Sequence, residues 1–171
     1  MTLQATRRIG TITLLIVLVD QITKRIAVHH LDLWDERIVL DGFFKFVHWG
    51  NTGAAWSLFH GHNERLAILS GLALAAILLL RSFFDTRGWI GQVSLACILG
   101  GVIGNLVDRL FVNHVIDFLR FYLYQRGGDE IGFPAFNVAD VAICVGVGLL
   151  FILSWQGKDQ TSAIPQTQPR R

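Results

Sequence analysis

The chain carries little charge for its length. Only 16% of its 171 residues are Asp, Glu, Lys or Arg, whereas a soluble domain usually carries about 25%. The formal net charge is +2, and the basic residues are dispersed along the chain, which argues against a nucleic-acid-binding protein. Hydrophobic residues make up 52% of the sequence, and the mean hydropathy is +0.47. This composition favours one membrane-embedded domain.

Cysteine is nearly absent. Cys97 and Cys144 both lie within apolar runs, where thiols usually pack as small hydrophobic side chains rather than form disulfides or bind metals. Two histidine groups could hold a metal, although solvated loop histidines are the commoner explanation: His29-His30 and His60-Gly61-His62. We therefore expect no metal and no cofactor.

Four long apolar runs stand out, at about residues 9–28, 66–84, 89–108 and 138–155. About 20 helical residues, at ~1.5 Å each, span the hydrocarbon core of a bilayer. The second run is long enough only if it includes Phe83 and Phe84, with Arg81 snorkelling to the interface. We interpret all four runs as transmembrane helices. The alternative is a soluble helical bundle with an unusually large core.

The first run could instead be a cleaved signal peptide, since Arg7 and Arg8 precede it. Asp20, Lys24 and Arg25 interrupt its second half, however, and no small-residue cleavage site follows. We predict a retained helix. Residues 1–156 then form one membrane-embedded domain, and residues 157–171 are expected to form a polar, disordered cytoplasmic tail.

Basic residues lie before the first run, between the second and third, and after the fourth: Arg7, Arg8, Arg81, Arg87, Lys158, Arg170 and Arg171. Positively charged connections usually stay in the cytoplasm. Both termini are therefore predicted to be cytoplasmic, and the two longer connections to face outward, which in a bacterium is the periplasmic side.

The outer connections carry patterns of their own. Asp41-Gly42, between β-branched and aromatic residues, predicts a hairpin and a small outer-face β-sheet. Residues 114–128 are interpreted as a short outer amphipathic helix. Gly100 and Gly104 predict a close helix–helix contact. The expected fold class is thus an all-α membrane protein with four transmembrane helices, a small sheet and a short surface helix.

Polar and ionisable residues collect at the outer ends of the predicted helices, and such residues in a membrane usually mark function. They come from the first, third and fourth helices and from the connection after the third: Asp20, Lys24, Asn105, Asp108, Arg109, Asp117, Asn137 and Asp140.

Some of these residues also have simple structural interpretations. Asn137 could cap the fourth helix with Asp140 at its third position, a variant of the capping box. Asp117 alone could be a solvated surface acid. Asp20 and Lys24 could form an ion pair one turn apart, and Asp108 could pair with Arg109.

Asp117 and Asp140 together suggest catalysis. Two carboxyl groups at close range cannot both ionise easily, so one keeps a proton while the other acts as a base. Such a pair can activate water against an amide carbonyl without a cofactor.

Four sequence blocks in this order resemble the lipoprotein signal peptidases, or signal peptidase II: VDQITK (19–24), NTGAAWS (51–57), GGVIGNLVDR with HVIDF (100–109 and 114–118), and FNVAD (136–140). The resemblance implies an aspartic endopeptidase that removes signal peptides from diacylglyceryl-modified bacterial prolipoproteins, just before the lipidated cysteine. It further implies contact with membrane lipid, a multi-pass location in the bacterial inner membrane, and an active site near the periplasmic face. We expect a monomer.

The resemblance implies that Asp117 and Asp140 are catalytic. Seven further positions match residues that support the pair or contact substrate: Asp20, Lys24, Asn51, Gly53, Asn105, Arg109 and Asn137. Trp56 and His48-Trp49-Gly50 depart from the family pattern, which bears on the outer sheet and its fit to substrate.

A small proton-coupled transporter or channel is the alternative function, with Asp20, Asp108 and Asp140 as relay sites. These acids cluster at one membrane face rather than forming a chain across the bilayer. The sequence also shows no internal repeat of the kind that many transporters carry.

Overall fold

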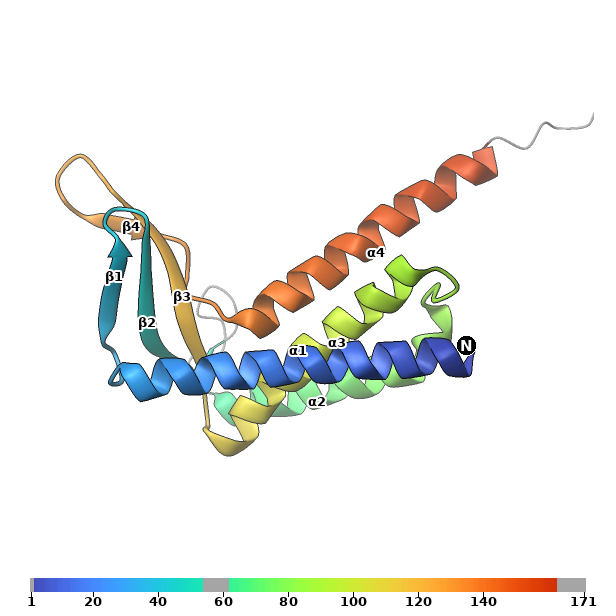
Figure 1. Ribbon diagram of the computed structural model, residues 1–171, viewed down its shortest axis with the longest axis horizontal. Coiled ribbons are helices and arrows are strands. Elements are labelled where there is room, and N and C mark those ends of the chain that lie inside the picture. The colour runs from blue at the N-terminus through green and yellow to red at the C-terminus, as the bar shows by residue number, and fades with distance from the viewer. Residues whose placement is uncertain (1, 54–61, 163–171) are drawn as a thin grey trace, which may run out of the picture.

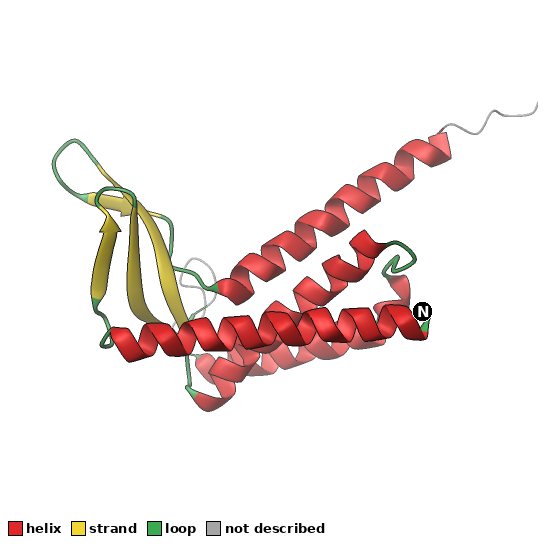
Figure 2. Ribbon diagram, in the orientation of Figure 1, coloured by secondary structure: helices red, strands yellow, loops and turns green. Residues whose placement is uncertain are grey.

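A computed structural model of the protein describes residues 2–53 and 62–162. Long helices form a bundle, and an antiparallel sheet stands at one end of it (Figures 1 and 2). The helices are α1 (Leu3–His30), α2 (Asn63–Leu79), the 3₁₀ turn η2 (Arg81–Phe83), α3 (Trp89–Phe111) and α4 (Val138–Ser162). The strands are β1 (Glu36–Leu40), β2 (Phe44–Asn51), β3 (Val115–Tyr124) and β4 (Glu130–Gly132), in that order across the sheet.

The start of α1 and the end of α4 both lie at the end of the bundle away from the sheet (Figure 1). The N-terminus of α1 is capped by Thr2, whose hydroxyl accepts a hydrogen bond from the Ala5 amide at 3.2 Å. α1 thus begins before the predicted position 9. α4 continues to Ser162, beyond the predicted position 155, and residues 163–171 lie outside the described part of the chain.

Two helices in the described ranges are long and apolar enough to cross a membrane, namely α3 and the Val138–Trp155 part of α4. The α3 span is 67% buried within the protein, whereas only 17% of the α4 span is buried. α4 therefore presents an apolar surface to its surroundings. The 28 residues of α1 include charged side chains, and the 17 residues of α2 are fewer than the ~20 of a typical span.

α3 is the central helix and contacts the other three long helices. Its glycines allow the close approach that the sequence predicts. A Cβ atom at Gly100 would lie 2.7 Å from Ile16 of α1, and one at Gly104 would lie 2.6 Å from Asp20. On the α4 side, a Cβ at Gly101 would lie 2.3 Å from the carbonyl oxygen of Ala139. These contacts bring the polar ends of α1, α3 and α4 together.

The predicted hairpin is present, with β1 and β2 joined around Asp41-Gly42. Gly42 has φ +69, a conformation that glycine adopts at little cost. The predicted surface helix at residues 114–128 is wrong, because residues 115–124 form β3, paired with β2 on one side and β4 on the other. The aromatic and β-branched residues of this segment favour a strand, and its ladder partners are distant in sequence.

A buried lysine ties three strands of the sheet together. Lys45 of β2 forms ion pairs with Glu36 of β1 and, at 2.8 Å, with Glu130 of β4. Its ammonium group also lies 4.6 Å from the centre of the Tyr122 ring on β3. Opposite charges and an aromatic face thus compensate for the burial of this cation.

Candidate active site

Asp117 lies on β3, buried at the junction between the sheet and the helices. Its Oδ2 accepts a hydrogen bond from the side-chain amide of Asn51 at 2.9 Å. Its Oδ1 accepts one from the side-chain amide of Asn137 at 2.8 Å. Asp117 is therefore a held, desolvated carboxyl group rather than a solvated surface acid.

Asp140 lies in the first turn of α4 and is half-buried. Its Oδ2 accepts a hydrogen bond from the backbone amide of Asn137 at 3.1 Å, and its own backbone amide donates to Asn137 Oδ1 at 3.0 Å. This reciprocal pair is the predicted capping box. Asp140 Oδ1 also accepts a hydrogen bond from the side chain of Asn105 on α3, at 2.8 Å.

Asn137 joins the two aspartates. It is fully buried, and its side-chain NH₂ group donates to Asp117. Its backbone N–H donates to Asp140, and its side-chain oxygen accepts from the backbone N–H of Asp140. Each aspartate also accepts a hydrogen bond from one further asparagine, Asp117 from Asn51 and Asp140 from Asn105. The carboxyl groups are thus oriented by neutral amides from three different segments.

Burial, together with the negative charge of Asp140, raises the pKa of Asp117 to about 7. The hydrogen bonds from Asn51 and Asn137 and the charge of Lys24 act in the opposite direction. A carboxyl group that titrates near neutral pH is suited to exchange a proton during a reaction.

Lys24 of α1 is the centre of a buried ionic cluster beside this pair. Its ammonium group lies 2.8 Å from Asp20 Oδ2 and 2.8 Å from Asp108 Oδ2, and it donates to Asn105 Oδ1 at 3.0 Å. The predicted ion pair between Asp20 and Lys24 is confirmed. Asp20 Oδ1 also accepts the backbone amide of Ala139 at 2.9 Å, which joins α1 to the first turn of α4.

The predicted ion pair between Asp108 and Arg109 is wrong. Asp108 turns inward to Lys24 and accepts the backbone amide of Ile116 at 3.1 Å. Successive helical side chains point in different directions, and Arg109 instead reaches the carbonyl oxygens of Asn105 and Gly53, at 3.4 and 3.5 Å. Its Nε has no hydrogen-bond partner among the described residues.

Two contributors to the site were not predicted. Gln21 donates to Asp108 Oδ1 at 2.8 Å and to the Gly104 carbonyl at 3.2 Å, which closes the cluster around Lys24. Asn63, at the start of α2, donates to the carbonyl of Arg109 at 3.0 Å. Gln21 could have been found from the sequence, because it is a polar residue that interrupts the first apolar run.

Gly53 belongs to the site, since its amide donates to Asn51 Oδ1 at 2.9 Å and its carbonyl faces Arg109. Trp56 and His60 lie outside the described residues. In the described ranges, no group of three or more His, Cys, Asp or Glu side chains could hold a metal ion.

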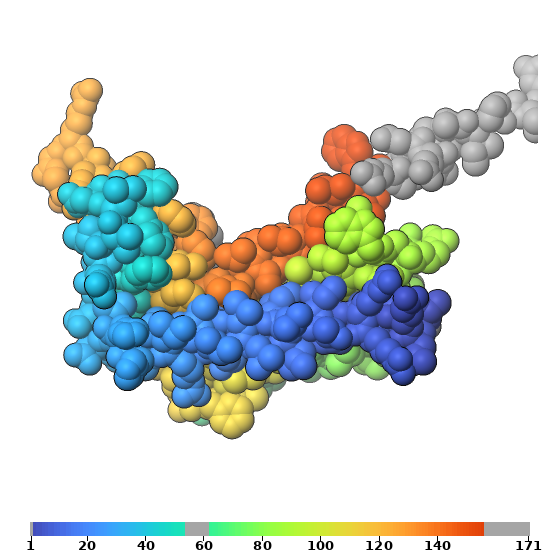
Figure 3. Space-filling view, in the orientation of Figure 1, coloured from blue at the N-terminus to red at the C-terminus, as the bar shows by residue number. Residues whose placement is uncertain are grey.

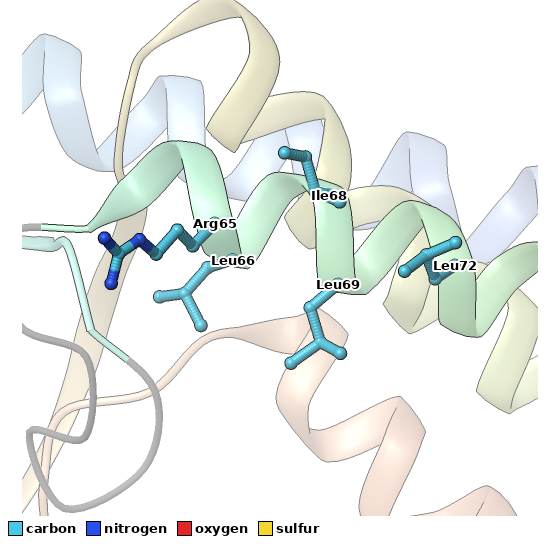
Figure 4. Close-up of a pocket in the computed structure, with 5 residues that line it drawn as sticks. All are labelled: Arg65, Leu66, Ile68, Leu69 and Leu72. Atoms are coloured by element: carbon cyan, nitrogen blue, oxygen red, sulfur yellow. The ribbon is translucent and has the colours of Figure 1, made fainter.

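The surface is hollowed between the sheet and α4 (Figure 3). A separate, mainly apolar cavity of about 250 Å³ lies along α2, where Leu66 and Leu69 point toward the start of α4 (Figure 4). Arg65, Ile68 and Leu72 complete its lining. A second cavity, of about 620 Å³, lies at the α2–α3 connection and is lined there by Asp85 and Arg87.

Comparison with known proteins shows the family of the chain. The family model for signal peptidase (SPase) II matches residues 12–156. A lipoprotein signal peptidase of Lactobacillus gasseri is 37% identical over 141 residues, covering 82% of this chain and 87% of that protein. One from Listeria monocytogenes is 33% identical over 153 residues, covering 90% and 96%. A solved bacterial membrane enzyme superposes with a TM-score of 0.74 at 25% identity, covering 95% of this chain and 94% of its own.

Proposed function

The chain belongs to the signal peptidase II family of lipoprotein signal peptidases, and we propose that it cleaves diacylglyceryl-modified prolipoproteins just before the lipidated cysteine. In this proposal Asp117 and Asp140 are the catalytic pair of an aspartic endopeptidase. The observation that carries it is the shared hydrogen bonding of both carboxyl groups to the buried Asn137.

The two aspartates have complementary tasks. One carboxylate removes a proton from water, and the other, protonated carboxyl group donates to the oxygen of the scissile carbonyl. The amides of Asn51, Asn105 and Asn137 hold both groups in place, so that little reorganisation is needed when charge develops. Asp20, Lys24 and Arg109 support the pair from the helices.

We further propose that all four long helices span the inner membrane of a bacterium, with both termini in the cytoplasm. Family membership and the membrane-enzyme neighbour indicate a bacterial membrane protein. The ends of α1 and α4 lie opposite the sheet (Figure 1), which supports a sheet and an aspartate pair at the periplasmic face. Charged residues of α1 are compatible with a span, because Asp20 and Lys24 are buried against each other.

The substrate carries two acyl chains and an apolar signal sequence, so it needs apolar surface near the aspartates. The cavity along α2, with Leu66 and Leu69 directed toward α4, offers such a surface (Figure 4). We propose that this face accommodates part of the substrate within the bilayer, while the sheet holds the peptide that follows the cleavage site.

Cleavage of a purified prolipoprotein tests this function. The wild-type enzyme should process the diacylated precursor and leave the unlipidated precursor intact. Asp117→Asn and Asp140→Asn should each lose about 100-fold or more in rate while remaining folded. Asp129→Asn is the matched control, because Asp129 is exposed in the connection between β3 and β4. Full processing by either Asp117→Asn or Asp140→Asn would refute the aspartate pair.

A further inference from the structure

We propose that Lys24 acts through Asn105 to keep Asp140 ionised in the resting enzyme, so that Asp140 is the base and Asp117 is the acid that carries the proton. This assignment rests on the proposed function. Lys24 is thus a positioning residue, since it contacts neither the water nor the peptide that react.

The ammonium group of Lys24 has three hydrogen-bond donors, and three buried oxygens surround it. Two belong to the carboxylates of Asp20 and Asp108, and the third is the side-chain oxygen of Asn105. This last contact determines the orientation of the Asn105 amide. Because its oxygen faces Lys24, its NH₂ group must face Asp140, which it does at 2.8 Å.

Asp140 is therefore polarised by a cation through one intervening amide. It also lies in the first turn of α4, where the free backbone amides of a helix favour a negative charge, and it accepts the Asn137 amide there. Hydrogen bonds to the ionised form and a nearby positive charge both favour the carboxylate.

Asp117 has a different environment. It lies on a strand rather than at a helix end, is only 3% exposed, and accepts hydrogen bonds from two neutral side-chain amides, those of Asn51 and Asn137. Among the described residues, neither donor is itself bonded to a cation. With an ionised Asp140 acting on it, Asp117 is the member of the pair that keeps the proton.

The charged groups around the two aspartates are equally divided between positive and negative. Four charged groups of α1 and α3 act on the pair or form ion pairs with groups that do: Asp20, Lys24, Asp108 and Arg109. Two are positive and two are negative, so they impose no net charge on the two aspartates. A desolvated pair in such surroundings is most stable with a single negative charge, hence with one proton.

The proposed step balances in protons and electrons. Asp140 removes a proton from water, the oxygen of that water bonds to the carbonyl carbon, and Asp117 gives its proton to the carbonyl oxygen. The proton on Asp140 then passes to the leaving nitrogen as the carbon–nitrogen bond breaks. Asp117 recovers a proton from the tetrahedral intermediate, which restores the starting state.

The pH profile of kcat/KM for a diacylated precursor tests the assignment, because its acid limb reports the base and its basic limb reports the acid. Asn105→Ala should move the acid limb upward by about one pH unit, a tenfold loss below the midpoint. Asn51→Ala, the matched variant at Asp117, should leave the acid limb in place and move the basic limb upward.

Lys24→Met should move the acid limb in the same direction as Asn105→Ala, and Lys24→Arg should restore most of the wild-type profile. If Lys24→Met fails to fold because Asp20 and Asp108 lose their cation, the comparison of Asn105→Ala with Asn51→Ala is sufficient to test which aspartate is the base. Both of these variants leave the ion pairs of Lys24 intact.

The assignment would be overturned if Asn51→Ala moved the acid limb of the profile and Asn105→Ala moved the basic limb. A uniform loss of rate in Asn105→Ala without any displacement of the profile would overturn it as well, because a merely structural role predicts that result. These outcomes differ from failure of the proposed function, in which Asp117→Asn or Asp140→Asn would still cleave the precursor.

Discussion

The side-chain amide of Asn137 lies 2.8 Å from Oδ1 of Asp117, although the two residues belong to different segments at the junction of sheet and helices. The oxygen of the same amide group accepts the backbone N–H of Asp140. The residue that caps α4 therefore also links Asp117 to Asp140. The orientation of one buried asparagine decides where both carboxyl groups point.

Asn137→Ser should separate the two tasks of this residue. Serine is as good an N-cap as asparagine, so the free energy of unfolding should change by less than about 0.5 kcal/mol. Its hydroxyl cannot cap the helix and replace the amide donor to Asp117 in the wild-type geometry, so the cleavage rate should fall about tenfold or more. Thermal unfolding in detergent and a cleavage assay measure the two effects.

Asn137→Ala is the comparison for this experiment, because it removes the cap as well and should cost about 1 kcal/mol of stability. A serine variant with wild-type cleavage would show that the hydrogen bond between Asn137 and Asp117 is dispensable.

The raised pKa of Asp117 predicts how stability depends on pH. The folded-state pKa of about 7 is higher than the ordinary value of 3.8, so the folded protein binds this proton more tightly than the unfolded chain. The contribution of Asp117 to stability is therefore fully present below about pH 4 and is lost as the pH rises to about 7.

Asp117→Asn removes this titration. The melting temperature of the variant relative to wild type should accordingly increase between pH 5 and pH 8, as measured by thermal unfolding at both values. A difference that is the same at both pH values would contradict the raised pKa.

The contact between α3 and α4 predicts an effect of Gly101→Ala. The added methyl group would meet the backbone oxygen of Ala139, and relief of this overlap requires α4, with Asp140, to move away. We expect a loss of about 1–3 kcal/mol in stability together with slower cleavage. Gly148→Ala on α4 is the control, because a Cβ there meets no atom within 4 Å. Equal behaviour of the two variants in unfolding and cleavage assays would argue against this packing.

The arrangement of the chain ends predicts the membrane topology. A reporter that is active only in the periplasm should be inactive when fused after Arg171 and active when inserted between Gly127 and Gly128, in the connection from β3 to β4. The physical reason is that basic residues are concentrated at the chain ends and in the α2–α3 connection, and positively charged connections usually stay in the cytoplasm. Reporter activity at the C-terminus would reverse the proposed orientation.

Much of the site could be predicted from the sequence because its signals are local. The capping box of Asn137 and Asp140 spans one helical turn, and so does the ion pair of Asp20 and Lys24. Asp41-Gly42 likewise predicts the hairpin of β1 and β2 from a few adjacent residues. Such features depend on backbone geometry that adjacent residues determine themselves.

Other features could not be read from neighbouring residues. Asp108 stands beside Arg109 in the sequence but pairs with Lys24, because the close packing of α1 against α3 at Gly100 and Gly104 brings that lysine inward. The segment of Asp117 contains enough aromatic residues to suggest a surface helix, yet β2 and β4 provide ladder partners for it.

The sequence by itself determined the long helices, the gathering of polar residues toward one end of them and the family to which the chain belongs, since periodicity, turn chemistry and short motifs are properties of adjacent residues. Only the tertiary structure decided that Asn137 joins Asp117 to Asp140 and that Lys24 reaches Asp140 through Asn105. These contacts join residues far apart in the chain. Their geometry depends on how closely α1, α3, α4 and the sheet pack, which neighbouring residues do not specify.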